Sequence, residues 1–199
     1  MTPDQILGFY SEGFFPMAEH REDQDFQFYA PYTRALLPIR SLHIPKRLKR
    51  KIHKSPFDIR FDTNFAEVIR ACANMQRSKE SGTWINDRII SLFIDLHELG
   101  IAHSVESWKD GRLVGGLYGL ALGSTFCGES MFSIESDASK IALVYLCDHL
   151  DKQGFKLLDS QFRNPHLDQF GLYEIPQKDY VKLMQAGLLD SVQFYSHSE

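Results

Sequence analysis

Residues 102–132 have the sequence AHSVESWKDGRLVGGLYGLALGSTFCGESMF, and they predict the centre of the fold. Apolar and polar side chains alternate over residues 102–108, as they do in a β-strand. Asp110-Gly111 is a strong signal for a tight turn between two antiparallel strands. We therefore expect residues 112–122 to return antiparallel and residues 124–132 to add a third strand.

The segments on either side of this meander supply helices and further strands. After it, we expect a helix capped by Asp137 and ended by Gly154, a strand over 155–162 and a C-terminal helix that begins at Pro176. Before it, the predicted elements are helices over 2–12, after Pro45, over 64–73 and over 86–97, strands over 34–38 and 58–61, and a polar linker over 74–82. This order favours an α+β fold in which helices pack on a mixed sheet, an outline shared by acyl-CoA N-acyltransferases.

The composition argues against several classes of protein. A net charge of −4, from 22 basic and 26 acidic residues, is not that of a protein that coats nucleic acid through bulk charge, so any RNA contact must be local. No apolar stretch approaches the roughly 20 residues that span a bilayer, and the start of the chain has no secretory pattern, so we expect a cytoplasmic protein. The three cysteines and eight histidines show no metal-ligand spacing, and no heptads predict a dimer. We expect a monomer with no metal and no cofactor.

The densest chemical signal is Gly128-Glu129-Ser130-Met131-Phe132-Ser133, at the end of a predicted strand. A carboxylate is the natural partner of an ammonium group, so Glu129 could bind an amino group in a pocket. The alternative is an ordinary carboxylate on the protein surface, which composition by itself favours.

Asp159 and Gln161 form a second signal, because they are two residues apart in the strand predicted over 155–162 and would share one of its faces. A carboxylate and an amide could together orient an attacking amine and take up its proton, which is acyl-transfer chemistry without a covalent enzyme intermediate. From the residues alone, a buried polar pair that satisfies loop backbone groups is an equally good interpretation.

The third signal is the segment PKRLKRKIHK, residues 45–54, which holds six Lys or Arg residues in an acidic chain. It could bind the phosphates of an RNA end, although such a helix is more often a solvated face. Trp84 follows the polar linker and could stack on a base or wall a pocket, although most aromatic residues lie in cores.

Together, these segments resemble the leucyl/phenylalanyl-tRNA–protein transferase family over about residues 3–183. The resemblance is carried by GFFPM (13–17), TWI (83–85), HSVE (103–106), LVGGLYG (113–119), GESMFS (128–133) and LDSQF (158–162). Two features depart from the pattern of longer members. The chain starts close to the first family helix, without the extension and its Gly-Gly-Asp-Leu-type motif, so we expect part of the tRNA-binding surface to differ. Leu172-Tyr173 replaces small residues, so the acceptor preference is left open.

The resemblance implies transfer of Leu, Phe or Met from aminoacyl-tRNA to the α-amino group of proteins that begin with Arg or Lys, which marks those proteins for degradation. It implies a small N-terminal domain over 1–33 and an acyltransferase-like catalytic domain over 34–199. It also implies that Asp159 and Gln161 are the catalytic pair, and that Glu129, with Ser130 beside it, holds the aminoacyl end or its amino group. The terminal adenosine would contact Trp84, and an apolar amino-acid pocket would be built from Met17, Leu117, Phe126 and Leu146. The acceptor stem would lie on Lys46, Arg47, Lys49, Arg50, His53 and Lys54.

Two rival functions make different demands on the sequence. A coenzyme A-dependent N-acetyltransferase needs a glycine-rich pyrophosphate loop before its central helix, and no Gln/Arg-x-x-Gly-x-Gly/Ala segment precedes Asp137. A module that only binds a tRNA end would keep the basic segment and Trp84, but it would have no use for Asp159 and Gln161.

Overall fold

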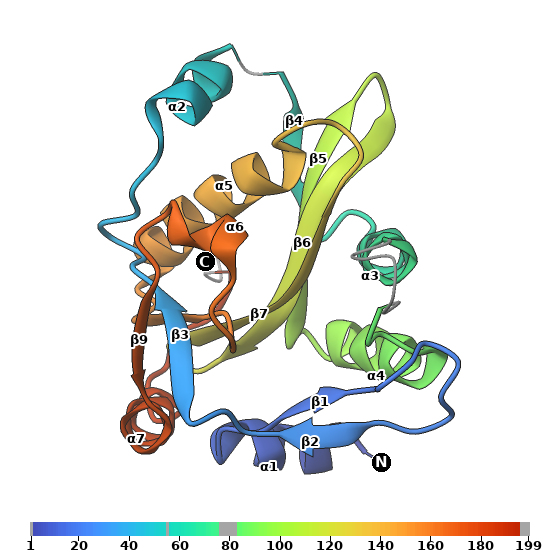
Figure 1. Cartoon of the computed structure of the whole chain (residues 1–199), viewed down its shortest axis with the longest axis vertical. Coiled ribbons are helices and arrows are strands. Elements are labelled where there is room, and N and C mark those ends of the chain that lie inside the picture. Colours follow the sequence, from blue (N-terminus) through green and yellow to red (C-terminus); the bar gives the residue numbers. More distant parts are fainter. Residues whose placement is uncertain (1, 55, 76–82, 196–199) are drawn as a thin grey trace.

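A computed structural model describes residues 2–54, 56–75 and 83–195, and it confirms the α+β fold with helices on a mixed sheet (Figure 1). The helices are α1 (Pro3–Ser11), α2 (Lys46–His53), α3 (Phe65–Asn74), α4 (Asp87–Glu98), α5 (Ala138–Gln153), α6 (Pro165–Asp168) and α7 (Gln177–Gly187). The strands are β1 (Phe15–Met17), β2 (Gln27–Tyr29), β3 (Thr33–Leu37), β4 (Asp58–Phe61), β5 (Ala102–Lys109), β6 (Arg112–Leu122), β7 (Thr125–Ser133), β8 (Leu157–Asp159) and β9 (Tyr173–Pro176). The linker predicted over 74–82 falls mostly outside the described residues.

The main sheet has the strand order β4-β5-β6-β7-β8-β3-β9, and β1 pairs with β2 in a separate sheet. The predicted meander of β5, β6 and β7 is confirmed. Neighbouring strands of the main sheet are antiparallel except β7 and β8, which are parallel. Parallel neighbours require a crossover along the sheet, and α5 provides it.

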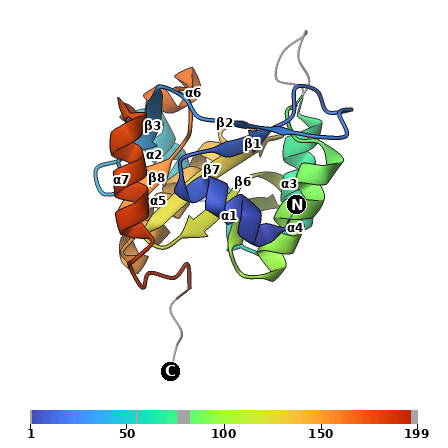
Figure 2. The ribbon, with the colours of Figure 1, turned by 90° about the horizontal axis from the view of Figure 1, so that it is seen from below.

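Helices cover both faces of the main sheet: α5 packs on one face, and α3 packs on the other with α4 beside it (Figures 1 and 2). Neighbouring residues of a strand point to opposite faces, so β6 contributes to two separate cores. Leu117 belongs to the core on the α5 side, whereas the ring of Tyr118 packs edge-on against Phe65 and Phe93 on the other side.

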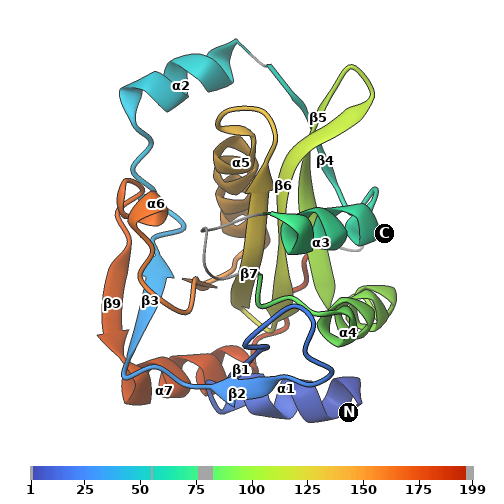
Figure 3. The same ribbon diagram turned by 45° about the vertical axis from the view of Figure 1, so that its right-hand side comes forward.

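The N-terminal segment packs against the rest of the chain at the end opposite α2 (Figure 3). The predicted first helix is confirmed as α1: a capping box of Thr2 and Gln5 opens it, and it contacts α4 and α7. Ile6 and Tyr10 of α1 are fully buried in the same core as Phe93. The division into two domains at residue 33 stays a prediction.

The strand predicted over 155–162 is shorter in the structure, because β8 ends at Asp159. The backbone N–H of Gln161 donates to the Asp159 carboxylate at 2.9 Å, and Gln161 has a φ of 59°, in the left-handed region. A side chain that captures the N–H two residues ahead forms a turn and ends a strand. Our expectation that Asp159 and Gln161 share a strand face is therefore wrong.

Asp137 precedes α5 as predicted, but its side chain makes no capping hydrogen bond. The carboxylate instead accepts from the ammonium groups of Lys51 at 3.1 Å and Lys140 at 3.2 Å. The N–H of Ser139 in the first turn of α5 donates to the Ser133 hydroxyl at 2.9 Å. The predicted side-chain cap is wrong, because two nearby cations attract the carboxylate more strongly than a backbone N–H does.

Within the described part of the chain, we find no helix that is both long enough and apolar enough to cross a bilayer.

Candidate active site

A cavity of about 820 Å³ opens where β7 and β8 part. The two strands pair only over Thr125–Cys127 and Leu157–Asp159, after which β8 ends and β7 continues beside β6. The pairing of β6 with β7 also shifts between Tyr118 and Gly119, which leaves Glu129 as an extra residue in β7, the pattern of a β-bulge. Residues 128–133 and 158–167 form two walls of the cavity.

The Asp159 carboxylate lies at the buried end of the cavity, and protein donors fill its acceptor positions. Its Oδ1 accepts from Arg34 Nε at 2.8 Å and from the Gln161 N–H at 2.9 Å. Its Oδ2 accepts from Arg34 Nη2 at 2.6 Å and from the Tyr180 hydroxyl at 2.9 Å. A carboxylate offers about four lone-pair sites, so Asp159 has no free site at which to take a proton from a substrate.

Arg34 fixes this arrangement from the core of the molecule. Its side chain is 0% exposed, its guanidinium lies 4.7 Å from the ring centroid of Phe15 and 4.4 Å from that of Tyr180, and its Nη1 donates to the Gly13 carbonyl at 2.9 Å. Burial acts to lower the pKa of this guanidinium, but the Asp159 carboxylate more than offsets burial and raises that pKa. The pair joins the N-terminal segment, β3, β8 and α7 at one point.

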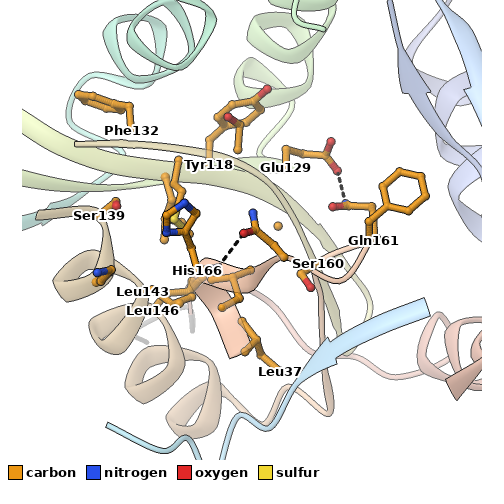
Figure 4. A pocket seen from close by; sticks show the side chains of 18 of the residues that line it. Leu37, Tyr118, Glu129, Phe132, Ser139, Leu143, Leu146, Ser160, Gln161 and His166 are labelled. Atoms are coloured by element: carbon orange, nitrogen blue, oxygen red, sulfur yellow. Dashed lines mark hydrogen bonds between the residues drawn. The ribbon is translucent and has the colours of Figure 1, made fainter. Parts of the chain in front are cut away.

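Glu129 and Gln161 lie side by side in the cavity wall, as Figure 4 shows. The Gln161 amide donates to Glu129 Oε1 at 3.2 Å, and the Tyr10 hydroxyl donates to the same oxygen at 2.8 Å. Burial raises the pKa of Glu129 to about 8; the nearby Asp159 charge acts in the same direction, while the Tyr10 hydrogen bond and Arg34 oppose it. Glu129 therefore accepts a proton near neutral pH, and no cation pairs with it among the described residues.

Most of the predicted substrate-binding side chains line this cavity. Met17, Trp84, Leu117, Glu129, Ser130, Leu146, Asp159 and Gln161 all do so. Phe126 does not: it is fully buried, and its ring centroid lies 5.7 Å from that of Phe194. The apolar wall is built by Leu37, Leu143 and Leu146, which lie across the cavity from Glu129 and Gln161 (Figure 4).

The basic segment forms α2 as predicted, and the six side chains that we assigned to tRNA binding are all exposed. These are Lys46, Arg47, Lys49, Arg50, His53 and Lys54. A seventh, Lys51, points the other way and donates to the carbonyl of Ser136 and the carboxylate of Asp137. Ser136 and Asp137 both line the cavity, so α2 is attached to its rim.

Sequence reasoning missed three residues of the site: Tyr10, Arg34 and Tyr180. Arg34 carried a usable signal, because a charged residue directly before the apolar Ala35-Leu36-Leu37 needs a buried partner if the segment is a central strand. Tyr10 and Tyr180 lie on amphipathic helices, where an aromatic residue is an ordinary core residue, and nothing in the sequence distinguished them.

The fold and the site define a protein with a deep, partly apolar cavity that ends in a fixed set of hydrogen-bonding groups, as suits an enzyme that binds an apolar acyl group and a polar nucleophile. The family described as leucyl/phenylalanyl-tRNA protein transferase matches residues 36–185. A relative named leucyl/phenylalanyl-tRNA–protein transferase, from Paramagnetospirillum magneticum, is 48% identical over 98% of this chain and 92% of its own length. A relative of the same name from Hyphomonas neptunium is 46% identical over 99% of this chain and 76% of its own length. The chain thus belongs to the leucyl/phenylalanyl-tRNA–protein transferase family, a family of aminoacyltransferases.

Solved structures give more distant matches. L-PGS from Bacillus licheniformis is 12% identical with a TM-score of 0.44, over 81% of this chain and 51% of that one. A GCN5-related N-acetyltransferase-like protein from Streptococcus suis is 15% identical with a TM-score of 0.38, over 86% of this chain and 63% of that one.

Proposed function

We propose that this enzyme transfers Leu, Phe or Met from aminoacyl-tRNA to the α-amino group of proteins that begin with Arg or Lys, and so marks them for degradation. The observation that carries the proposal is the cavity itself, which joins an apolar wall to the groups of Asp159, Gln161 and Glu129. We further propose that the enzyme acts as a monomer in the cytoplasm, with residues 1–33 as a small domain beside the catalytic one.

The apolar wall supports an aliphatic or aromatic apolar amino acid as the transferred group. Leu37, Leu117, Leu143 and Leu146 are each at most 3% exposed and line the cavity, so they offer a preformed surface of methyl groups. Burying a Leu, Phe or Met side chain on such a surface is worth about 1.5–3 kcal/mol. Trp84 and Met17 line the same cavity and supply the contacts proposed for the terminal adenosine and the amino acid.

The hydrogen bonds support a division of roles between Asp159 and Gln161. Asp159 holds the backbone N–H of Gln161, and all its lone-pair sites are in use, so we assign it to positioning rather than to proton transfer. The NH₂ group of the Gln161 amide donates a hydrogen bond to Glu129. The carbonyl oxygen of the same amide is therefore left to accept a hydrogen bond from the attacking amine. Because the aminoacyl ester is already activated, holding the two reactants together accounts for much of the catalysis.

Charge supports the choice of a cationic acceptor. Of the three acidic side chains on the cavity wall, Asp137 and Asp159 are already in ion pairs. Glu129 is the third, and among the described residues it has hydrogen-bond donors but no cation. An acceptor that begins with Arg or Lys brings a positive charge, which stabilises the ionised form of Glu129.

The first test is to incubate the purified protein with radiolabelled Phe-tRNA and a protein with N-terminal Arg. We expect label in acid-precipitable product that resists RNase, and little label when the same acceptor begins with Asp. Asp159→Asn should reduce the transfer strongly, because it leaves Arg34 without its counter-charge.

Charged-tRNA binding measured in parallel identifies the alternative function. If the wild-type protein binds Phe-tRNA but transfers nothing to either acceptor, the enzyme proposal is wrong, and a tRNA-end binding module is the better description.

A further inference from the structure

The wall of the cavity carries a histidine to which the proposed mechanism gives no role. His166 lies in the short helix α6, its side chain is exposed, and it lines the cavity; Figure 4 shows it beside Leu143 and Leu146, on the side away from Gln161. Histidine suits acid–base catalysis, because its side chain ordinarily both gives and accepts a proton near neutral pH.

The backbone around His166 is fixed while its ring stays available. The N–H of His166 donates to Asn164 Oδ1 at 2.9 Å, and its carbonyl accepts from Gln169 Nε2 at 2.7 Å. Within the described chain, neither ring nitrogen has a hydrogen-bond partner. A side chain held at its root with two free ring nitrogens can make hydrogen bonds to a substrate.

The other charged side chains of the wall are already engaged by neighbouring groups. Asp137 is paired with Lys140 and Lys51, Asp159 with Arg34, and Arg163 with Asp168 and Glu174. The Glu129 carboxylate accepts from Tyr10 and Gln161, on the far side of the cavity from the apolar wall. Within the described residues, the His166 side chain has no such partner, so it can serve a bound substrate.

The reaction needs such a group, since one proton has to move as the ester becomes an amide. The acceptor nitrogen bonds to the ester carbon, the bond from that carbon to the tRNA 3′ oxygen breaks, and the proton lost by the nitrogen ends on that oxygen. An alkoxide is a poor leaving group, so the 3′ oxygen should be protonated as it departs. Asp159 cannot move this proton because its lone pairs are all in use, and Gln161 cannot because an amide is a very weak base. Apart from Glu129, whose carboxyl is held by Tyr10 and Gln161, the groups described so far do not supply a proton for the leaving oxygen.

We propose that His166 is a further catalytic residue, which in its protonated form gives a proton to the departing 3′ oxygen and then regains one from the acceptor nitrogen as the amide forms. The inference rests on the proposed function. It predicts that the importance of His166 depends on the leaving group, which a residue with only a structural or binding role would not show.

The test compares two substrates: Phe-tRNA with the natural 3′ ester, and the same tRNA charged through a 3′ sulfur as a thioester. A thiolate leaves without first being protonated, because thiols are far more acidic than alcohols. With the ester, we expect His166→Gln and His166→Ala to lower kcat roughly 10²-fold with KM little changed. With the thioester, both variants should transfer phenylalanine at close to the wild-type rate.

His20→Ala is the matched control, because it removes an exposed histidine that does not line the cavity, and it should leave both reactions unchanged. Equal losses with ester and thioester, or a raised KM with normal kcat, would show that His166 is not the acid. A wild-type protein that uses neither substrate would instead reject the proposed function.

Discussion

At the scale of single residues, the site depends on one buried ion pair. Arg34 and Asp159 are both 0% exposed, and removing one member of such a pair leaves an unpaired charge in the core. Arg34→Met should lower the free energy of unfolding by roughly 3–5 kcal/mol. Arg34→Lys keeps the charge but not the two parallel hydrogen bonds, so we expect an intermediate loss.

Urea unfolding of wild type, the two single variants and the double variant measures the coupling energy between Arg34 and Asp159. Arg34→Met combined with Asp159→Asn should be less destabilising than the sum of the two single changes, because neither charge is then left alone. A loss equal to that sum would contradict the assigned pairing.

Glu129 should make stability depend on pH. Its pKa is about 8 in the folded protein and near the ordinary 4.5 in the unfolded chain. Between these values the folded state binds the additional proton, so the free energy of unfolding falls as pH rises, by at most about 1.4 kcal/mol per pH unit. The contribution of Glu129 to the free energy of unfolding is fully present below pH 4.5 and is lost above pH 8.

Glu129→Gln should remove this part of the slope, because a neutral amide has no proton to lose. The measurement is urea unfolding at pH 5 and pH 8.5, with Glu98→Gln as the exposed control, which should keep the wild-type slope. If the free energy of unfolding changes with pH to the same extent in wild type and Glu129→Gln, the pKa of Glu129 is not raised by folding.

At the scale of elements, α2 is built to present charge. Leu48 is its one buried residue, and Lys49 and Arg50 are exposed, so these two side chains can be changed with little cost to folding. If α2 lies on the tRNA backbone, Lys49→Ala and Arg50→Ala should each weaken binding and reduce the slope of log affinity against log salt by about 0.7–0.9.

The control for this prediction is Lys152→Ala, which removes an exposed lysine of α5 that pairs with Asp148. It should leave the salt slope unchanged. A slope that does not change for Lys49→Ala and Arg50→Ala would place the RNA elsewhere on the molecule.

At the scale of the whole molecule, the C-terminal segment after α7 ties the outer strands to α5. Phe194 is 3% exposed, and its ring stacks on that of His103 in β5 with the ring centroids 4.0 Å apart. The Phe194 carbonyl oxygen lies 2.6 Å from His149 Nε2 in α5. The Tyr195 hydroxyl donates to the Asp62 carboxylate at 2.7 Å.

Phe194→Ala should therefore lower the free energy of unfolding by roughly 3–5 kcal/mol, as large-to-small changes in a core do. Leu189→Ala lies in the same C-terminal segment, but its side chain is 87% exposed, so it should change stability by no more than about 0.5 kcal/mol. Urea unfolding at one pH compares the two, and similar values for both would contradict the buried role of Phe194.

Local interactions are what the sequence determined. The Asp110-Gly111 turn and the helix starts near Thr2, Asn64 and Asn86 are stabilised within a few residues, so local sequence predicts them without knowledge of the rest of the chain. The meander of β5, β6 and β7 was predicted in the same way, from its alternating pattern and its tight turn. The chemical character of Glu129, Asp159 and Gln161 was also visible, because polar groups in apolar strands need a partner.

Packing between distant segments sets how those groups are used. Tyr10 reaches Glu129 across 119 residues of sequence, and Arg34 reaches Asp159 across 125. The order of the strands and the burial of each charge arise from packing of distant segments, and the free energy of a buried charge depends on its whole surroundings rather than on its neighbours in sequence. For the same reason, local pattern placed Gln161 in a strand and Asp137 in a cap. The Asp159 carboxylate that turns the chain at Gln161 is held by the distant Arg34 and Tyr180, and Asp137 is drawn to the distant Lys51.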